Sequence, residues 1–225
     1  MLVTEYDITS EKLSRDYNIV MLSDIHNKPA PDLLQQVSDL APDYIFVPGD
    51  LVDRHRKTYK NVIPFLTELV KIAPVYFSPG NHEIKFPKLS ARDIAATGVH
   101  VLDNKWVKVE DFILGGQIPY MTFDWIHDLE QQEGYKILLN HHPEYIEEGL
   151  ADFDLDLILA GHAHGGQWVL FGKAIYAPGQ GLFPKYTHGF YGNMLVGAGT
   201  TNTIAPFTGR FGNPCEIVQL KFHKA

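Results

Sequence analysis

Cysteine is almost absent from this chain, because Cys215 is the only one among its 225 residues. A single cysteine excludes an internal disulfide, so the fold must depend on an apolar core, and a reducing compartment is compatible with the sequence. Cys215 itself is expected to be a buried, small apolar residue. A chain of this length can form one domain, residues 1–225, with a core large enough to support a rigid site.

Long hydrophobic runs are also missing. No stretch reaches the roughly 18 to 20 apolar residues that a membrane-spanning helix requires. Residues 1–7 include acidic side chains and contain no basic segment followed by an apolar one, so neither a signal peptide nor a membrane anchor is expected. We therefore expect a soluble, cytoplasmic protein.

Positive charge is scarce. The chain carries 19 Lys and Arg against 27 Asp and Glu, which gives a formal net charge of −8. Proteins that bind nucleic acid through their overall field are basic, so no nucleic-acid surface is expected. Anionic small molecules are not excluded, because bound metal ions would set the local sign of the charge.

The sequence does contain five short apolar runs, each followed by residues that can bind a metal ion. They are residues 19–22 before Asp24 and His26, 44–47 before Asp50, 75–77 before Asn81 and His82, 137–139 before His141, and 157–159 before His162 and His164. Runs of this length, rich in β-branched or aromatic residues and bounded by Gly or Pro, indicate buried strands. Because ligand sites gather at the carboxyl ends of strands in layered α/β folds, we expect these polar side chains to converge.

Helical patterns separate the early runs. Apolar spacing predicts helices at residues 31–40, 61–71 and 89–97, the last ended by Gly98. Alternation of strand and helix favours parallel pairing with right-handed crossovers.

After Gly98 the pattern changes to closely spaced strands. Residues 99–102, 106–110 and 112–115 follow one another quickly, which is typical of antiparallel pairing. We expect one more helix near residues 123–131, and further strands joined by long loops from 167 to 220. Together these patterns predict two packed sheets flanked by helices.

The residue types in these motifs suit a particular class of metal. Imidazole and carboxylate ligands together accept Zn, Mn or Fe, and Asp24 and His26 can reach one ion from a single turn. Asp50 can bridge two ions with its two oxygens, and Gly49 beside it allows close approach of the backbone. Each motif alone is a weak signal, but the whole set favours a metal centre.

In this order the motifs Asp-x-His, Gly-Asp, Gly-Asn-His-Glu, His and Gly-His-x-His resemble those of the calcineurin-like metallophosphoesterase family. Segments 181–184, 190–191 and 213–216 also resemble its branch of small bacterial phosphodiesterases. Residues 195–199 differ from that branch, reading Leu-Val-Gly-Ala-Gly where it has Val-Ser-Arg-Gly. The resemblance implies a four-layer α-β-β-α sandwich of two mixed sheets flanked by helices.

The resemblance also implies two divalent ions, Mn, Zn or Fe, and assigns their ligands. The first ion would be held by Asp24, His26 and His164, the second by Asn81, His141 and His162, and Asp50 would bridge them. Each ion then has four protein ligands, which leaves room for substrate oxygens and for a bridging hydroxide that attacks phosphorus. His82 is the expected general acid, oriented by Glu83 or another carboxylate, and its alternative role is to bind a phosphate oxygen as an imidazolium.

The leading functional hypothesis is therefore a metal-dependent hydrolase of small-molecule phosphoesters, with phosphodiesters preferred to monoesters. A second hypothesis is cleavage of the pyrophosphate bond in a nucleotide-linked sugar or lipid. A third, from another class, is a non-catalytic interaction module of the same fold. The sequence makes no prediction of oligomeric state.

Several further residues have simpler expected roles. Surface positions are expected for His55, His100, His127, His188 and His223. His142 is expected to pack or to form a hydrogen bond beside the site, and residues 54–57, Arg-His-Arg-Lys, to form a solvated basic turn, with contact to a substrate phosphate as the alternative. Aromatic residues near the end of the chain could wall a pocket, although core packing is favoured for at least half of them: Phe183, Tyr186, Phe190 and Tyr191.

Overall fold

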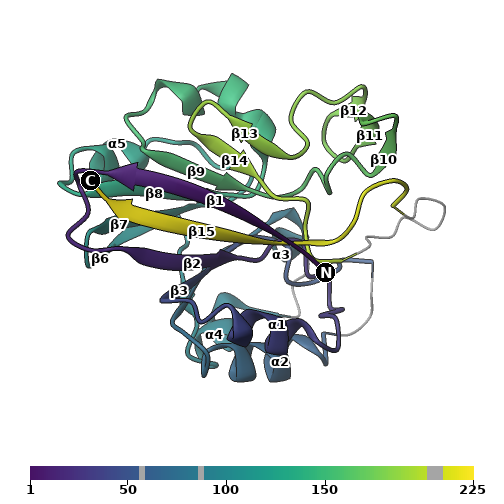
Figure 1. Ribbon diagram of the computed structural model, residues 1–225, viewed down its shortest axis with the longest axis horizontal. Helices are drawn as coiled ribbons and strands as arrows, with labels where there is room; N and C mark the ends of the chain where they lie inside the picture. The colour runs from purple at the N-terminus through teal and green to yellow at the C-terminus, as the bar shows by residue number, and fades with distance from the viewer. Residues whose placement is uncertain (56–58, 86–88, 202–209) are drawn as a thin grey trace.

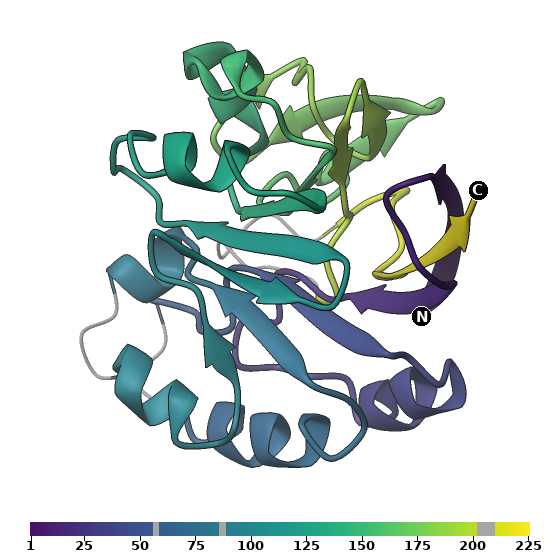
Figure 2. The same cartoon turned by 90° about the vertical axis from the view of Figure 1, so that its left-hand side faces the viewer.

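The structure is a computed structural model that describes residues 1–55, 59–85, 89–201 and 210–225. Two six-stranded sheets pack face to face, and helices cover the outer face of each (Figures 1 and 2). The predicted four-layer sandwich of two mixed sheets is confirmed. Arg56 and Lys57 of the expected basic turn lie outside the described residues.

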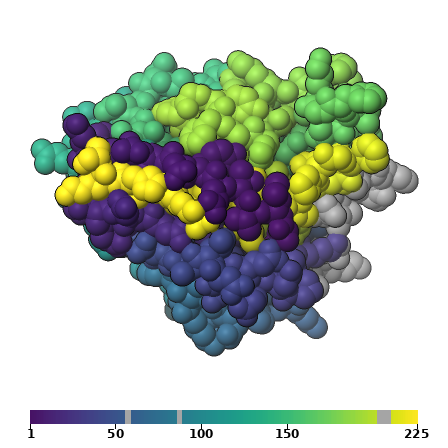
Figure 3. Space-filling model, viewed as in Figure 1, coloured from purple at the N-terminus to yellow at the C-terminus, as the bar shows by residue number. Residues whose placement is uncertain are grey.

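The first sheet has the strand order β1-β15-β2-β3-β4-β5. Its strands are β1 (Leu2–Ser10), β15 (Glu216–Lys224), β2 (Tyr17–Met21), β3 (Tyr44–Pro48), β4 (Val75–Ser78) and β5 (His100–Val101). β2 to β5 are parallel, β15 is antiparallel to β2, and β1 is parallel to β15. The sheet is therefore mixed, although it is built around a parallel centre. Figure 3 shows the first and last strands side by side on one face of the molecule, in purple and yellow.

Three helices cover the outer face of this sheet: α1 (Leu33–Asp39), α2 (Val62–Leu69) and α4 (Ala91–Ala95). Their apolar stripes, represented by Val37, Leu66 and Ile94, pack in one buried cluster with Val47 and Phe77 of the strands. All three predicted helices are present, each shorter than its pattern because the terminal residues form turns.

The second sheet has the order β13-β14-β9-β8-β7-β6. Its strands are β13 (Gly189–Tyr191), β14 (Met194–Val196), β9 (Leu157–Ala160), β8 (Tyr135–Asn140), β7 (Phe112–Gln117) and β6 (Lys105–Val109). Its outer face packs against α5 (Ile126–Glu130) and two 3₁₀ helices, η1 (Pro143–Glu148) and η2 (Leu150–Asp152), in a second buried cluster.

A third apolar cluster fills the space between the two sheets. Phe46 from the first sheet and Phe112 and Leu139 from the second are fully buried in it, together with Phe222 of β15. Each such side chain contributes roughly 1.5–3 kcal/mol relative to an exposed one. This layer holds the two sheets at a constant separation, so the loops at their carboxyl ends face one another.

The pairing predicted for residues 99–115 is only partly right. β6 and β7 are antiparallel, as expected, but β5 pairs in parallel with β4 of the first sheet. The backbone N–H of Leu102 donates to the carbonyl of Phe77 at 2.7 Å, and the chain then turns at Asn104, whose φ is +45°. That turn carries the chain from one sheet to the other, so proximity in sequence does not mean pairing.

The segment predicted as strands and long loops contains a small third sheet, antiparallel in the order β10-β11-β12. Its strands are β10 (Trp168–Leu170), β11 (Lys173–Ala177) and β12 (Gly181–Leu182).

Cys215, expected to be buried, is partly exposed. Among the described helices, none has the length and apolar character needed to cross a bilayer.

Candidate metal centre

The loops that follow five strands converge at one edge of the sandwich. Asp24 and His26 follow β2, Asp50 follows β3, Asn81 and His82 begin the short helix α3 (Asn81–Ile84) after β4, His141 follows β8, and His162 and His164 follow β9. The first three strands belong to one sheet and the last two to the other. The site therefore lies where the carboxyl ends of both sheets meet.

Asp50 is at the centre of this group. Its Oδ2 lies 3.1 Å from Nε2 of His141, 3.7 Å from Nε2 of His26 and 3.9 Å from Nε2 of His82. Its Oδ1 accepts a hydrogen bond from the backbone N–H of His82 at 2.9 Å. One carboxylate oxygen thus faces imidazoles from three separate loops, an arrangement that a shared ligand requires.

The residues assigned to the first ion lie together. Asp24, His26 and His164 are buried, and their potential ligand atoms are within 4.8 Å of one another. Oδ1 of Asp24 is 3.8 Å from Nε2 of His26 and 3.5 Å from Nε2 of His164. Asp24 and Asp50 form a similar group with His141, which connects this half of the centre to the other.

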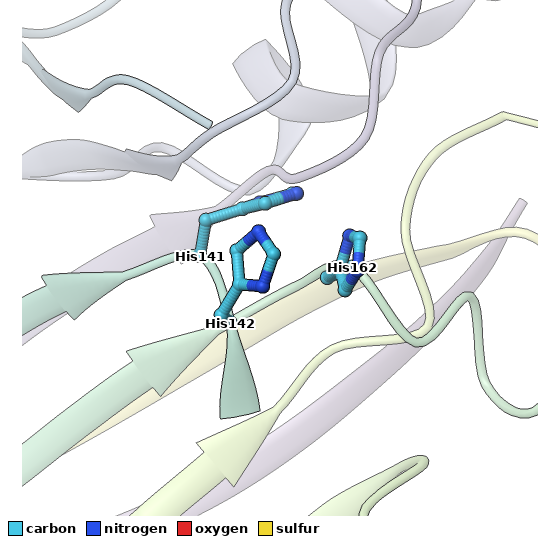
Figure 4. A group of neighbouring side chains, drawn as sticks. All are labelled: His141, His142 and His162. Atoms are coloured by element: carbon cyan, nitrogen blue, oxygen red, sulfur yellow. The ribbon is translucent and has the colours of Figure 1, made fainter. Parts of the chain in front are cut away.

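Of the residues assigned to the second ion, His141 and His162 lie together, with ring centroids 5.0 Å apart. His141 and His162 form a potential ligand group that also includes His142 (Figure 4). The ring of His142 stacks on that of His162 with centroids 4.1 Å apart, and its Nδ1 is 2.9 Å from Oε1 of Glu144. His142 thus packs beside the site as expected, with its Nε2 buried and unpaired among the described residues. Oδ1 of Asn81 is likewise buried and unpaired within that part of the chain.

The backbone is strained at five of these positions. Asp24, His26, Asp50, His162 and His164 all have φ between 48° and 66°, in the left-handed region that non-glycine residues seldom occupy. Such conformations persist only where the surrounding structure imposes them, and they are common at functional sites. Here they turn the side chains away from the strand direction and toward the shared edge.

Glycines allow the loops to approach closely. A Cβ at Gly49 would lie 2.4 Å from Nδ1 of His141, and one at Gly80 would lie 2.3 Å from Oδ1 of Asp50. Since real Cβ atoms do not approach so closely, any larger residue at either position would displace a candidate ligand.

Glu83 holds two of the loops together. Its Oε2 accepts hydrogen bonds from the backbone N–H groups of Gly80 and Asp50, at 2.7 and 2.9 Å, and its Oε1 accepts one from Val52 at 2.9 Å. Glu83 or another carboxylate was expected to orient His82; Oδ1 of Asp53 lies 3.7 Å from Nδ1 of His82, but the carboxylate of Glu83 binds backbone donors instead. The reason is that α3 begins at Asn81, so its third residue points back to the loop that carries Asp50.

The imidazoles that face the centre are in the form that binds cations. Burial lowers the pKa of His26 to about 4 and holds those of His162 and His164 well below the usual histidine value. Both ring nitrogens of His26 are buried and have no hydrogen-bond partner in the described chain. Neutral rings with unused lone pairs are what a metal ion requires, so the donor set fits divalent metal ions.

His141 differs from the other imidazoles. Burial alone would lower its pKa, but the carboxylates of Asp50 and Asp24 outweigh that effect and raise the pKa to about 10. Its Nδ1–H donates to the carbonyl of Pro48 at 2.8 Å, which leaves Nε2 directed at Asp50. A histidine fixed in this way by a backbone carbonyl is a typical metal ligand.

The two central carboxyl groups are electrostatically distinct. Burial, with a contribution from Asp50, raises the pKa of Asp24 to about 6. Burial would also raise the pKa of Asp50, but His141 and the neighbouring imidazoles hold it well below its usual value. Asp50 therefore stays ionised to a lower pH than Asp24, which suits a bridging ligand.

His82 lies at the edge of the centre and faces a cavity. Its Nδ1 accepts a hydrogen bond from the backbone N–H of Arg54 at 3.1 Å, so the neutral ring carries its proton on Nε2. Its side chain is 12% exposed, and burial lowers its pKa. In an imidazolium, Nδ1 would also carry a proton, and that N–H would face the backbone N–H of Arg54. This geometry therefore favours the neutral ring.

The cavity beside His82 has a volume of about 560 Å³. Metal-facing residues form its floor, and aromatic and charged side chains form its walls: Arg54, Asn81, His82, Lys85, Tyr120, His142, Glu144, Tyr145, Glu148, His162, Tyr176, Pro178 and Gly179. Sequence reasoning missed most of the wall, because these residues come from five separated segments and carry no motif. Arg54 of the expected basic turn does reach this wall.

Arg210 is a second residue that the sequence patterns did not indicate. Its guanidinium donates to the backbone carbonyls of Ala198 and Gly199, and Nη2 lies 3.4 Å from Nδ1 of His164. Residues 195–199 are the segment at which the small phosphodiesterase branch has an arginine. In this chain, an arginine that comes later in the sequence contacts this segment and His164.

Apart from His55, whose ring lies 5.9 Å from that of His82, the remaining histidines and the four aromatic residues are not among the groups that form the centre. His55, His100, His127 and His188 are exposed and His223 is partly exposed. Tyr186 is buried in the core of the second sheet and Tyr191 packs against it, whereas Phe183 and Phe190 are exposed. None of these four aromatic residues is among the described residues that wall the cavity.

Comparison with known proteins agrees with this architecture. The family model for calcineurin-like phosphoesterases matches residues 17–166. A protein of Helicobacter pylori strain 26695, described as an uncharacterized metallophosphoesterase, is 27% identical over 237 residues, covering 97% of this chain and 63% of that protein. The transmembrane protein with metallophosphoesterase domain of Bos taurus is 30% identical over 251 residues, covering 96% of this chain and 54% of that protein.

Among solved structures, the protein TT1561 of Thermus thermophilus matches with a TM-score of 0.51 at 12% identity, covering 64% of this chain and 81% of that one. That similarity concerns the fold alone. Fold, buried His and Asp cluster and family match together define a metal-binding phosphoesterase domain. The chain belongs to the calcineurin-like phosphoesterase family, and it spans between half and two thirds of the length of the curated relatives it matches.

Proposed function

We propose that the protein is a dinuclear metal-dependent hydrolase that acts on phosphodiesters. The observation that carries the proposal is the position of Asp50, whose Oδ2 lies 3.1 Å from Nε2 of His141 and 3.7 Å from Nε2 of His26, and so next to candidate ligands of both ions. Asp24, His26 and His164 would hold one ion, and Asn81, His141 and His162 the other. Two such ions lower the pKa of bound water and neutralise charge on phosphoryl oxygens.

The charge of the cavity supports a preference for diesters. Arg54 and Lys85 contribute positive charge to its wall, and Glu144 and Glu148 contribute the same amount of negative charge. A phosphodiester carries one negative charge and a monoester up to two, so a wall with no net charge adds no attraction for the second charge of a monoester. The volume also falls in the range of roughly 300–1,000 Å³ that sites for small organic ligands show.

His82 is positioned to act on the oxygen of the leaving group. With Nδ1 occupied by the N–H of Arg54, its Nε2–H is the available donor toward the cavity. We infer that the neutral ring donates a hydrogen bond to a phosphoryl or leaving-group oxygen, in preference to transferring a proton as a general acid. Burial is the largest influence on the pKa of His82 and lowers it, and although Asp50 and Asp53 act in the opposite direction the net shift favours the neutral form.

The proposal is tested with purified, manganese-loaded protein on bis-aryl phosphates, mono-aryl phosphates and nucleotide sugars. We expect the bis-aryl phosphate to be hydrolysed fastest. Faster turnover of the nucleotide sugar would favour pyrophosphate cleavage instead. Absence of metal-dependent turnover on all three would favour a non-catalytic module.

The role of His82 is tested by His82→Ala, with His127→Ala as the control because that ring is on the surface. We expect turnover to fall by roughly 10²–10³-fold while metal content is unchanged. A hydrogen bond to a phosphoryl oxygen predicts a similar loss for good and poor leaving groups, whereas proton transfer from a general acid predicts a much larger loss for poor ones. Wild-type turnover in the variant would contradict both roles.

A further inference from the structure

A small apolar sheet projects from the same end of the molecule as the metal centre. It consists of β10, β11 and β12, and Figure 1 places it opposite the end at which the chain terminates. Since β2 runs antiparallel to the final strand β15, the carboxyl end of β2, with Asp24 beyond it, faces the end occupied by this sheet. Tyr176 of β11 is also part of the cavity wall.

This sheet exposes an unusual amount of apolar surface. Phe171, at the turn between β10 and β11, is 103% exposed, Phe183 is 76% exposed and Leu182 is 68% exposed. We call the following set the apolar tip: Trp168, Leu170, Phe171, Leu182, Phe183 and Phe211, all of which are exposed.

The residues of the apolar tip come from the small sheet, from the turn between β10 and β11, and from the segment bridged to β10. Cross-strand pairing aligns Trp168 with Tyr176 and Tyr176 with Leu182, and an isolated bridge joins Trp168 to Phe211. Single exposed apolar residues are ordinary, but a contiguous group marks an interaction surface.

The charge of this region indicates what kind of partner it fits. Between Asp156 and Glu216 the sequence contains no acidic residue, although the whole chain has 27. The same stretch contains three basic residues, Lys173, Lys185 and Arg210. Lys185 pairs with Glu147 at 2.6 Å and Arg210 donates to backbone carbonyls beside His164, so Lys173, next to the turn that carries Phe171, is the cation that belongs to this surface.

We propose that the apolar tip docks on a bilayer whose surface carries anionic headgroups. Exposed Trp, Phe and Leu side chains insert at the boundary between headgroups and acyl chains, and Lys173 beside them contacts the headgroups. A carboxylate in the inserted region would oppose docking, and this region has none. Docking would bring the metal-binding edge of the sandwich close to the bilayer surface.

The proposal is tested by flotation of the full chain with vesicles of phosphatidylcholine and phosphatidylglycerol in equal parts. The wild-type protein should float with these vesicles and bind pure phosphatidylcholine more weakly. Phe171→Ser and Phe183→Ser should each weaken binding roughly tenfold, because each removes one inserted ring. Lys173→Glu should also weaken it, and added salt should reduce the wild-type binding.

The matched control is Phe190→Ser, which removes a phenyl ring that is 43% exposed but packs against Tyr6 on β1, outside the apolar tip. It should retain wild-type vesicle binding. Thermal unfolding and metal content of the Phe171 and Phe183 variants should match the wild type, because neither ring contributes to the core or the centre. These readouts do not depend on hydrolytic activity.

Two results would overturn the proposal. One is failure of the wild-type protein to float, or equal flotation of the Phe171 and Phe183 variants. The other is a wild-type dimer on size-exclusion chromatography that Phe171→Ser converts to a monomer while no form binds vesicles. The second result would show that the apolar tip contacts a second copy of the chain.

Discussion

At the scale of single residues, the centre is organised by the charge balance between Asp50 and His141. Nε2 of His141 is 3.1 Å from Oδ2 of Asp50, and both side chains are buried. The raised pKa of His141 means that the metal-free protein carries an imidazolium there, which supplies part of the positive charge that the carboxylates need. A metal ion that binds Nε2 must displace that proton.

This balance predicts a pH dependence of metal binding. The pKa of His141 is about 10 and that of Asp24 about 6, so between these values binding displaces a proton from His141 and none from Asp24. The apparent association constant for Mn²⁺ should therefore fall about tenfold for each unit of decreasing pH, and more steeply below pH 6. Titrations of metal-free protein from pH 6 to 9 would measure the slope, and a constant affinity across that range would contradict the assignment of His141.

At the scale of secondary-structure elements, the turns after the strands decide whether the ligands meet. Gly49 ends β3 with φ +93°, and its Cα lies so close to His141 that a Cβ would contact the ring. The turn that follows β3 of the first sheet is thus packed directly against His141, a candidate ligand that follows β8 of the second sheet.

Gly49→Ala should be far more damaging than the same change at Gly172. Gly172 has φ +74° and no atom within 4 Å of a Cβ, so alanine there costs only the backbone strain of about 1–2 kcal/mol. Alanine at Gly49 adds overpacking against His141, for a total of about 2–5 kcal/mol. Denaturant unfolding and Mn²⁺ affinity would be measured for both variants. Equal losses of stability with unchanged metal affinity would show that the contact with His141 is unimportant.

The elements themselves were predictable to different degrees. β2, β3, β4, β8 and β9 are apolar on both faces, so their burial is evident from composition. β1, an edge strand with half of its side chains exposed, has no such signal. The short helix α3 has four residues and no apolar stripe, and it forms because Glu83 binds backbone N–H groups of two loops.

At the scale of the whole molecule, one ion pair connects the outer edges of the two sheets. Glu216 at the start of β15 accepts hydrogen bonds from Oγ1 of Thr4 on β1 and from the backbone N–H of Ala198, and its Oε1 is 2.7 Å from Nε2 of His188, next to β13. Hydrogen bonds and the neighbouring His188 lower the pKa of Glu216 against the effect of burial, and Glu216 raises the pKa of His188.

These shifts predict a stability difference that depends on pH. The lowered pKa of Glu216 contributes stability above its unfolded value of 4.5, and the raised pKa of His188 contributes stability below its unfolded value of 6.5. The pair should therefore stabilise most between about pH 4.5 and 6.5. His188→Gln should cost roughly 1 kcal/mol at pH 5.5, after allowance for solvent screening, and less at pH 8.

His223→Gln is the matched control. Its Nε2 is also 2.7 Å from a carboxylate, Asp7, and its side chain is also 41% exposed, but Asp7 is on the surface whereas Glu216 is buried. Its loss should be within about 0.5 kcal/mol at both pH values. Thermal unfolding would measure both variants, and an equal pH response would show that burial of the carboxylate is irrelevant.

The sequence by itself determined which segments are buried strands and which residue types follow them. Alternating apolar strands and helices specified the layered class, and Asp24, Asp50, His141 and the other motif residues identified a metal centre. These signals are local, because a strand must be apolar and a ligand must be Asp, His or Asn wherever it lies in the chain.

Only the tertiary structure decided what surrounds those residues. The partners of Glu83, the proton position on His82, the approach of Arg210 to His164 and the cavity wall all depend on contacts between segments far apart in sequence. The apolar periodicity of the sequence does not predict such contacts, because they form only when the two sheets pack together and bring separate loops to one edge. The exposure of Phe171 likewise became known only from the tertiary structure, because an apolar residue in a sequence is expected to be buried.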